Sequence, residues 1–237
     1  MVLLGTIVNG LCIIMGTLIG KVFHKIPQRM KETVMSGIGL AVIVLGLQMS
    51  FKSQQFLIVI LSLVLGAVIG EWIDLDCKLN QMGNWLENKL GAKEGNSISQ
   101  GFVTATLIFV IGAMAIIGAL DSGIRRDHDV LYTKSIIDGF TSIILTTTLG
   151  IGVIFSAVPV MLYEGSIALF ATQIDRWVPK ELMDSFILEM TSAGGVMIFA
   201  IGLNLVGLTK IRVANLLPSI LVTALLVACF YYFNIQL

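Results

Sequence analysis

Long apolar runs separated by short polar segments fill most of this sequence. A helix needs about 20 consecutive apolar residues to cross the hydrocarbon core of a bilayer, and runs of about that length recur along the chain. The pattern therefore predicts an all-α, polytopic integral membrane bundle with about eight transmembrane helices. The expected spans are residues 2–22, 34–50, 56–71, 101–120, 135–156, 157–174, 185–208 and 213–233.

The segment 157–174 decides whether the chain has eight spans or seven. It begins near Pro159, carries Glu164 in its middle and is at the short end of the length that a span requires. If the segment crosses, the chain has eight spans. If it re-enters or bends, the chain has seven, and Glu164 lies near the lipid headgroups.

Residues 72–100 form the longest polar stretch of the chain, which we treat as a single membrane domain, 1–237. Apolar side chains recur in this stretch at helical spacing, which predicts an amphipathic helix at the membrane interface. The two expected spans within 101–156 are central helices. The apolar positions of the amphipathic stretch are Trp72, Leu75, Leu79, Met82, Trp85, Leu86 and Leu90.

Basic residues indicate the orientation. The first apolar run has no basic residue before it, and Lys21, Lys25, Arg29 and Lys31 follow it. Because basic loops favour the cytoplasmic side, we expect a retained first span with its N-terminus outside. The Lys and Arg bias over the later loops is the same for seven spans as for eight, so it does not settle their number.

Composition excludes several classes of protein. Of 237 residues, 56% are hydrophobic and 13% are charged, which leaves too few charges for the surface of a soluble domain. The mean hydropathy is +0.93. The formal net charge is zero, which gives no electrostatic case for binding nucleic acid. Cys12, Cys77 and Cys229 are far apart and form neither a disulfide framework nor a metal pattern.

Enzyme signatures are absent from the sequence, which contains no Walker loop, no zinc-binding helix motif and no nucleophile elbow. The two histidines, His24 and His128, lie in polar segments and fit no ligand spacing. We therefore expect a protein that is not an enzyme and that binds no cofactor or metal ion as a resident group.

Two apolar segments match each other without gaps, residues 39–48 (GLAVIVLGLQ) and 195–204 (GVMIFAIGLN). Each ends in a side-chain amide, and weaker upstream matches extend the likeness to a predicted repeat of units 1–71 and 157–237. With eight spans the units are offset by an odd number of crossings, so they cross the membrane in opposite directions. Inverted repeats of this kind are typical of secondary transporters. A chance likeness between Gly-rich helices is the alternative.

Polar side chains inside a membrane are costly, so each is a candidate functional group. Glu164, with its neighbour Tyr163, is the strongest candidate for binding a cation, a proton or a substrate. Asp138 and Glu189 lie four or five residues into their expected spans, where acids at helix N-termini are ordinary. Four neutral amides complete the candidate set and could equally join helices by hydrogen bonds, namely Asn9, Gln48, Asn204 and Asn215.

Small and hydroxyl-bearing residues mark the two central helices. Gly112, Gly118, Gly150 and Gly152 allow close approach or local unwinding of a helix. Close packing alone would also explain them. The polar face of the fifth span consists of Thr141, Ser142, Thr146, Thr147 and Thr148.

Several short motifs along the chain together resemble a known family. They are Gly5-Thr-Ile-Val-Asn9-Gly10, Gly112-Ala-Met114-Ala-Ile-Ile-Gly118-Ala119, Lys134-Ser-Ile-Ile-Asp138-Gly139, Gly150-Ile-Gly152-Val153, Tyr163-Glu164-Gly165 and Asn215-Leu-Leu-Pro218. In number and order they look like the YdfK-type family of prokaryotic inner-membrane proteins, catalogued as domain of unknown function 554. The resemblance covers essentially the whole chain. It implies a multi-pass protein of the bacterial plasma (inner) membrane and supplies no substrate.

Two functions from different classes are consistent with these features. The repeat, Glu164 and the Gly- and Thr-rich central helices favour a secondary transporter or channel for a small solute or ion. The alternative is a non-transporting membrane subunit, sensory or partner-binding, that docks through the segment 72–90 and the charged loop 121–134. In both cases the lipid bilayer surrounds the chain, and the Gly-faced helices permit a homo-oligomer. The sequence identifies neither the solute nor a coupling ion.

Overall fold

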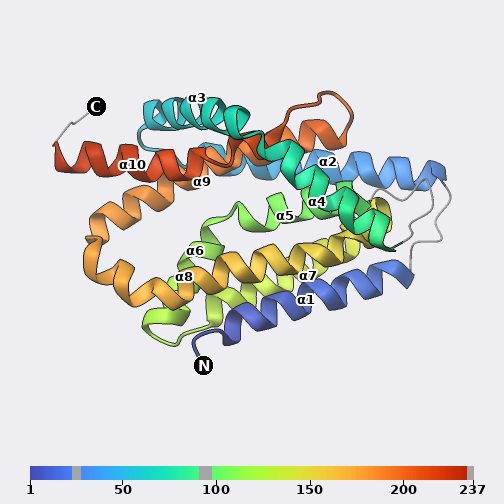
Figure 1. The fold of residues 1–237 in the computed structure, drawn as a ribbon, viewed down its shortest axis with the longest axis horizontal. Helices are drawn as coiled ribbons and strands as arrows, with labels where there is room; N and C mark the ends of the chain where they lie inside the picture. The colour runs from blue at the N-terminus through green and yellow to red at the C-terminus, as the bar shows by residue number, and fades with distance from the viewer. Residues whose placement is uncertain (23–27, 91–97, 234–237) are drawn as a thin grey trace. The chain divides into compact units, whose positions relative to one another are not determined.

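The computed structural model describes residues 1–22, 28–90 and 98–233, and all regular elements in these ranges are helices (Figure 1). The predicted all-α membrane fold is therefore confirmed. Residues 23–27 of the predicted basic loop and 91–97 of the polar stretch lie outside the described residues. The helices are α1 (Leu4–Val22), α2 (Gln28–Ser50), α3 (Phe56–Ile73), α4 (Leu75–Leu90), α5 (Ile98–Val110), α6 (Ala113–Ile124), α7 (Asp129–Leu149), α8 (Ala157–Trp177), α9 (Lys180–Leu205) and α10 (Ser219–Tyr232), with two short 3₁₀ helices, η1 (Ile151–Ser156) and η2 (Val213–Leu216).

Six helical segments of the described residues are long and apolar enough to cross a membrane. They are α1, α2, α3, η1 with α8, α9, and η2 with α10, and the bent pair α5 and α6 is a seventh candidate. The fifth expected span corresponds to α7, which is long enough at 21 residues. It is not among these candidates, and it carries three charged residues and several threonines. Eight crossings are therefore reached only if α7 also crosses.

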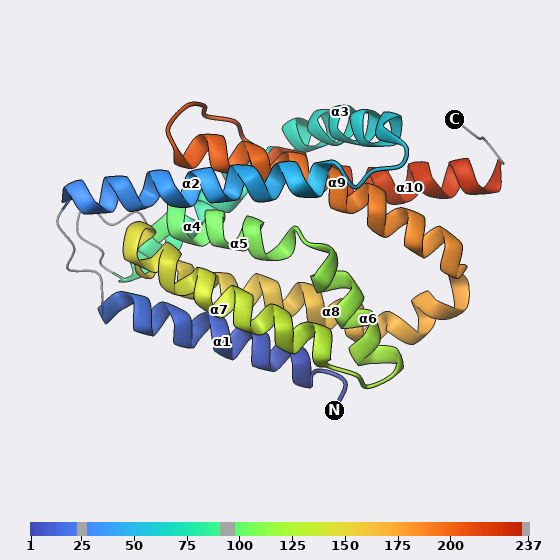
Figure 2. The ribbon, with the colours of Figure 1, turned by 180° about the vertical axis from the view of Figure 1, so that it is seen from behind.

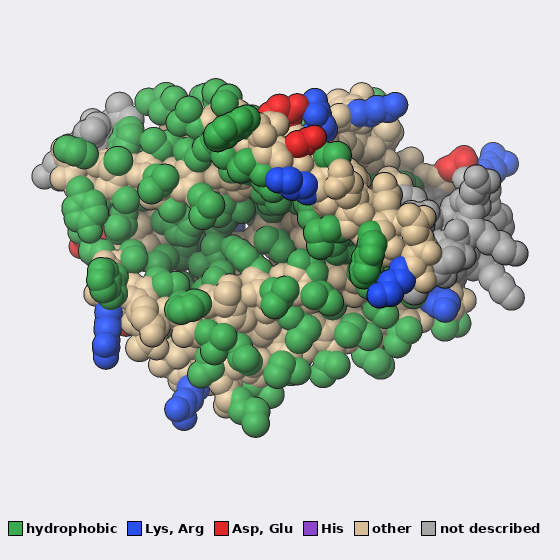
Figure 3. Space-filling view, viewed as in Figure 1, with side chains coloured by type: hydrophobic (Ala, Val, Ile, Leu, Met, Phe, Trp, Pro, Cys, Tyr) green, Lys and Arg blue, Asp and Glu red, His purple; other side chains and the backbone are tan. Residues whose placement is uncertain are grey.

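Apolar side chains cover much of the outside of the molecule, as expected for helices that face lipid. Figure 3 shows hydrophobic side chains over much of the visible face and few charged ones among them. The α7 helix also has an exposed apolar face, with Ile136, Ile137, Phe140 and Ile144. Such a helix suits a span that faces lipid on one side and a polar interior on the other.

The chain folds into two compact units, and each is assembled from two separate segments. Unit 1 comprises residues 1–35 and 79–176, and unit 2 comprises residues 36–78 and 177–237. Unit 1 therefore contains α1 and α5 to α8, while unit 2 contains most of α2 together with α3, α9 and α10.

In unit 1, α1 packs in parallel against α7 through glycines. A Cβ added to Gly16 would lie 2.2 Å from the carbonyl oxygen of Gly139, and one added to Gly20 would lie 2.6 Å from that of Ile143. Small residues allow this close approach of two helix backbones. Because the residue numbers rise together, the two helices run in the same direction, and both ribbon views show them side by side (Figures 1 and 2).

The α8 helix packs against α1 in the opposite direction. A Cβ added to Gly10 would meet Sδ of Met161 at 2.3 Å. Further along α8, a Cβ added to Gly165 would lie 3.8 Å from Cγ2 of Thr6, which precedes Gly10 on α1. The residue numbers on one helix rise as those on the other fall, so α1 and α8 are antiparallel.

In unit 2, α2 and α9 are antiparallel and meet through the glycines of the two matching segments. A Cβ added to Gly46 would lie 2.7 Å from the carbonyl oxygen of Gly195, and one added to Gly202 would lie 2.9 Å from that of Gly39. The same glycines also contact the helix residue one turn further along the partner. The segments that match in sequence are thus direct packing partners in space.

The α3 helix is antiparallel to the segment formed by η2 and α10. A Cβ added to Gly66 would lie 2.4 Å from the backbone nitrogen of Ser219, and one added to Gly70 would lie 1.9 Å from the carbonyl oxygen of Asn215. Neither glycine can be enlarged without moving a backbone.

The directions of these four helix pairs agree with eight alternating crossings. In that topology α1 and α7 are the first and fifth crossings and are parallel, while the pairs α1 with α8, α2 with α9 and α3 with α10 are antiparallel. If residues 157–174 did not cross, α2 and α9 would be parallel. If α7 did not cross, α1 and α8 would be parallel. The observed contacts have the sense that eight crossings require.

The structure corrects the expected boundaries of the central helices. The fourth span is broken into α5 and α6, which are bent by 62°. The fifth ends at Gly150, which has a φ of 85° and is followed by η1 rather than by a continued α-helix. From the sequence, Gly112 and Gly150 allowed either close packing or local unwinding, and the structure shows an interruption at both. The predicted charged loop, 121–134, is mostly helical, with only residues 125–128 between α6 and α7.

The predicted amphipathic segment forms a helix of its own. The α3 helix is followed by Asp74, whose left-handed backbone (φ 54°) allows the chain to turn into α4. Trp72 and Trp85 are exposed near this turn and on α4. Indole side chains in such positions suit a membrane interface.

Candidate functional site

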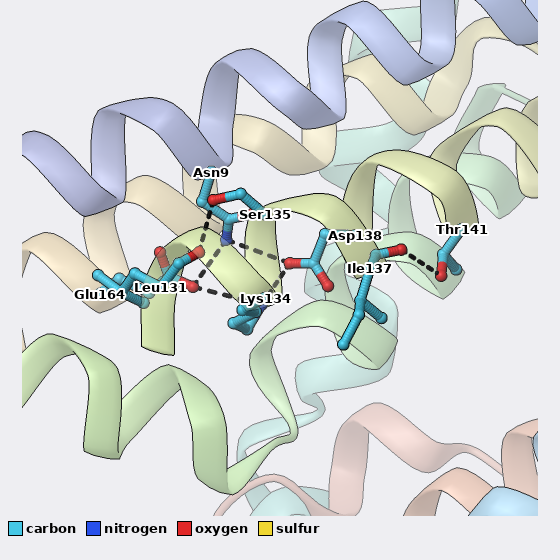
Figure 4. A network of polar contacts seen from close by, with 8 residues as sticks. All are labelled: Asn9, Leu131, Lys134, Ser135, Ile137, Asp138, Thr141 and Glu164. Carbon is cyan, nitrogen blue, oxygen red and sulfur yellow. Dashed lines mark hydrogen bonds and ion pairs between the residues drawn. The ribbon is translucent and has the colours of Figure 1, made fainter. Parts of the chain in front are cut away.

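Four polar side chains from three helices converge in the interior of unit 1 (Figure 4). Asn9 of α1 donates hydrogen bonds from Nδ2 to Oδ2 of Asp138 at 3.1 Å and to Oε1 of Glu164 at 2.8 Å. Lys134 of α7 binds Oδ2 of Asp138 and forms an ion pair with Oε1 of Glu164 at 3.3 Å. We call Asn9, Lys134, Asp138 and Glu164 the charged network.

Local sequence explains how the network is assembled. Lys134 and Asp138 are four residues apart on α7, so they lie on the same face of that helix. The glycine contacts of α1 with α7 and α8 hold all three helices close together. Asn9 and Glu164 are fully buried, and Lys134 and Asp138 are only 5% and 6% exposed.

The charges of the network are unbalanced. Two carboxylates, Asp138 and Glu164, face a single ammonium group, Lys134, so the ionised network carries one net negative charge. Among the described residues of unit 1, no other charged side chain is buried. An isolated buried charge is costly, so a further positive charge close to the carboxylates would stabilise this arrangement.

Hydrogen bonding in unit 1 is also incomplete. Within the described residues, five buried side-chain atoms have no hydrogen-bond partner, and all five belong to unit 1. Buried polar atoms are normally paired, so such a concentration calls for an explanation. Two of the five belong to the charged network. The atoms are Oγ1 of Thr6, Oδ1 of Asn9, Oγ1 of Thr106, Oγ of Ser142 and Oε2 of Glu164.

The surroundings of the network are partly aromatic. Nζ of Lys134 lies 6.0 Å from the ring centroid of Phe109, which is buried near the break between α5 and α6. The ring face contributes a weak attraction for the ammonium group. Tyr163, a predicted site residue, is half-buried on α8 and precedes Glu164 in the chain. Because the side chains of adjacent helix residues point about 100° apart, Tyr163 and Glu164 do not share a helix face.

The hydroxyl groups of α7 mostly bond to their own helix. Oγ1 of Thr141 donates to the carbonyl oxygen of Ile137 at 2.8 Å, and Oγ1 of Thr146 donates to that of Ser142 at 2.6 Å. This is the usual way for a hydroxyl to be satisfied inside a helix. Most hydroxyl groups on the predicted polar face of the fifth span therefore already have a hydrogen-bond partner, and Oγ of Ser142 is the exception.

Glu189, another predicted site residue, lies in unit 2 and is a capping group. It is 3% exposed, and its Oε1 accepts hydrogen bonds from the backbone nitrogens of Gln54 and Gln55, both at 3.0 Å. Its Oε2 accepts from the Ser53 hydroxyl. A carboxylate at the N-terminus of α3 satisfies free backbone N–H groups and opposes the helix dipole. Glu189 thus ties the turn between α2 and α3 to α9.

The remaining amides of the candidate set do not join the charged network. Oδ1 of Asn204 accepts from the backbone nitrogen of Ile211 at 2.9 Å and closes the turn after α9. Nδ2 of Asn215 donates to Oε2 of Glu71 at 2.5 Å, which links η2 to α3. Gln48 is exposed on α2.

The sequence placed Lys134 in a charged loop and did not select it as a site residue. The signal that could have found it is its spacing of four residues before Asp138, which pairs opposite charges on a helix. Thr6 was also not selected. It lies three residues before Asn9, so it shares a helix face with that amide.

In the part of the chain that the structure describes, no three His, Cys, Asp or Glu side chains form a group that could hold a metal ion. Nδ1 of His128 is 2.9 Å from Oγ of Ser122, so this imidazole is engaged at the turn between α6 and α7. His24 lies outside the described residues.

Comparison with known proteins finds a matching family and related bacterial proteins. The model of the family described as "Protein of unknown function (DUF554)" matches residues 4–228. The chain is 30% identical over 237 residues to the "Uncharacterized membrane protein YdfK" of Bacillus subtilis (strain 168), covering 98% of this chain and 99% of that protein. It is 26% identical over 223 residues to the "Uncharacterized protein YqgA" of Escherichia coli (strain K12), covering 92% and 93%. No solved structure matches the chain.

Proposed function

This chain belongs to the DUF554 family, and we propose that it is a secondary transporter for a small solute or ion, coupled to the binding of one positive charge at the charged network. The observation that carries this proposal is that two carboxyl groups, Asp138 and Glu164, are buried among α1, α7 and α8 with the single ammonium group of Lys134. Ionisable groups inside a membrane are expensive and commonly mark ion pathways or binding sites. The absence of a nucleotide-binding motif favours a transporter driven by an ion gradient.

A purely structural role would predict a different arrangement. Glu189 shows what such a role looks like in this protein, because both of its oxygens accept hydrogen bonds. Oε1 accepts from the backbone nitrogens just before α3, and Oε2 accepts from the Ser53 hydroxyl. In the charged network, by contrast, Oε2 of Glu164 and Oδ1 of Asn9 are buried without a partner. A structural ion pair gains nothing from unpaired oxygens, whereas a site that binds and releases a cation requires them.

The packing of the repeat segments supports a transporter of the inverted-repeat type. The alignment of 39–48 with 195–204 pairs Gly39 with Gly195 and Gly46 with Gly202. Under that pairing, the contact of Gly39 with Gly202 becomes the contact of Gly195 with Gly46, and both occur. A local twofold axis lying between antiparallel helices produces this relation. Inverted repeats of secondary transporters are related by such an axis in the membrane plane.

The proposed location is the bilayer of a bacterial plasma membrane. Both curated relatives come from bacteria, and one is named as a membrane protein. Apolar helices with satisfied backbones are the elements that span such a bilayer.

Charge movement in proteoliposomes tests the proposal without knowledge of the solute. Liposomes containing the purified protein are adsorbed on a solid-supported membrane and exposed to a jump in Na⁺, K⁺ or proton concentration. We expect a transient current as one positive charge enters the site. Glu164→Gln makes the network neutral without changing its shape, so it should reduce this current by about tenfold or more.

Glu71→Gln is the matched control, because it removes a half-exposed carboxylate in unit 2 and should leave the current unchanged. A folded wild-type protein that gives no current above that of protein-free liposomes after any of the three jumps would contradict the proposal. If one stoichiometric partner then co-purified, the alternative of a non-transporting subunit would be favoured.

A further inference from the structure

We infer that the positive charge bound at the charged network is an alkali-metal ion of the sodium class, held by Oε2 of Glu164, Oδ1 of Asn9 and Oγ1 of Thr6. This inference rests on the proposed function and names the coupling ion. All three oxygens are buried without a hydrogen-bond partner, and their residues are at most 2% exposed.

The charge of the site selects a monovalent ion. Lys134 already neutralises one of the two carboxylates, so a single further positive charge completes the balance. A divalent ion would leave a net positive charge in the same buried volume, at a similar electrostatic cost. Lys134 therefore supplies the first positive charge, and the bound ion needs to supply only one more.

The chemistry of the unpaired atoms selects a metal ion over a proton. A proton on Oε2 of Glu164 can make only one hydrogen bond, so it would satisfy one neighbouring acceptor. A cation satisfies several oxygens at once, and hard cations prefer carboxylate, amide and hydroxyl oxygens over nitrogen or sulfur. The Nδ2 group of Asn9 is committed to the two carboxylates, which leaves its Oδ1 free to coordinate.

Helix packing places the three residues on adjacent turns of α1 and α8. Thr6 and Asn9 lie three residues apart on the same face of α1. Asn9 bonds directly to Glu164 of α8, and the next residue on α8, Gly165, lies beside Thr6. An added Cβ on Gly165 would make only ordinary contacts, 3.6 Å or more from its neighbours, so α8 is less tightly packed here than at the other glycine contacts of α1.

Binding of ²²Na⁺ to the purified full-length protein in detergent tests the inference, at fixed pH and with choline keeping the ionic strength constant. We expect saturable binding that excess unlabelled Na⁺ or Li⁺ displaces. Thr6→Val removes one oxygen at nearly constant volume and should weaken binding by about tenfold, and Glu164→Gln should abolish it. Thr106→Val is the matched control, because Thr106 is also buried and unpaired but lies on α5, and it should bind within about twofold of wild type.

The outcomes separate this inference from the proposed function. Saturable ²²Na⁺ binding that is sensitive to Thr6→Val but not to Thr106→Val supports it. If the folded wild-type protein binds no ²²Na⁺ but gives a transient current after a pH jump, the coupling ion is a proton and the inference is overturned, while the transporter proposal stands. If it neither binds ²²Na⁺ nor gives a current after any jump, both are overturned. The binding of two variants is compared only if each variant unfolds at the wild-type temperature in the absence of Na⁺.

Discussion

Replacing Lys134 with methionine should lower the free energy of unfolding by about 3–5 kcal/mol. Lys134 is buried and bonds to both carboxylates of the network. Methionine keeps much of the length of the side chain but removes its charge, so Asp138 and Glu164 would become two buried like charges without a counter-ion. Unfolding of the purified protein by SDS in mixed micelles, followed by circular dichroism, measures the change.

The double variant Lys134→Met with Asp138→Asn separates the loss of charge from the loss of shape. It again carries one net negative charge, as the wild type does, so it should recover more than half of the lost stability. Lys210→Met, which removes an exposed lysine between α9 and η2, should change stability by no more than about 0.5 kcal/mol. A Lys134→Met protein as stable as the wild type would contradict the ionised state assigned to the network.

Replacing Gly46 with alanine should destabilise the protein by about 1–3 kcal/mol. A Cβ at this position would lie 2.3 Å from the backbone nitrogen of Phe199, so α2 and α9 would have to move apart. Thermal unfolding in detergent, read by circular dichroism or tryptophan fluorescence, measures the loss.

Gly37 is the matched control on the same helix. No atom lies within 4 Å of a Cβ added there, so Gly37→Ala should be neutral or stabilise α2 by up to about 1 kcal/mol through its helix propensity. Equal effects of the two substitutions would mean that α2 and α9 do not pack through these glycines. A larger loss in Gly46→Ala supports the close packing of α2 against α9 in unit 2.

The hydrophobic pattern predicted the helices well because a bilayer imposes a strict length requirement on an apolar helix. It failed where a span is interrupted. The break between α5 and α6 involves only a few residues, and Gly112 is apolar enough to be counted within a continuous run. The glycines at 112 and 150 gave the sole hint, since glycine permits backbone conformations and approaches that other residues do not.

The sequence selected three acidic residues as site candidates, and the structure divides them by what their carboxylates contact. Asp138 and Glu164 come together in unit 1 because α1, α7 and α8 pack against one another, and that arrangement is a property of tertiary packing. Glu189 has the same side chain as Glu164 and a similar depth of burial, yet it caps a helix. A carboxylate in an apolar run signals a buried partner, but the sequence does not say whether that partner is a backbone or a cation.

Lys134 was overlooked for a physical reason. A lysine near the end of an apolar run ordinarily reaches back toward the headgroups, so its position alone indicates a loop or an interface. Here α7 begins at Asp129, six residues before the expected span, and this places Lys134 within the helix and beside Asp138. These additional helical residues make Lys134 a member of the network.

Glu164 can serve as an ion site within the membrane only if α8 crosses the bilayer, and sided cysteine labelling decides this. The native residues Cys12, Cys77 and Cys229 are replaced by alanine, and single cysteines are placed at Lys52 and Lys210, two exposed positions in the turns after α2 and α9. A membrane-impermeant maleimide is then applied to intact cells and to inverted vesicles. Eight crossings with an inverted repeat predict that the two positions label from opposite sides. Labelling of both from the same side would contradict the topology, move Glu164 away from the membrane interior and remove the basis for a transporter.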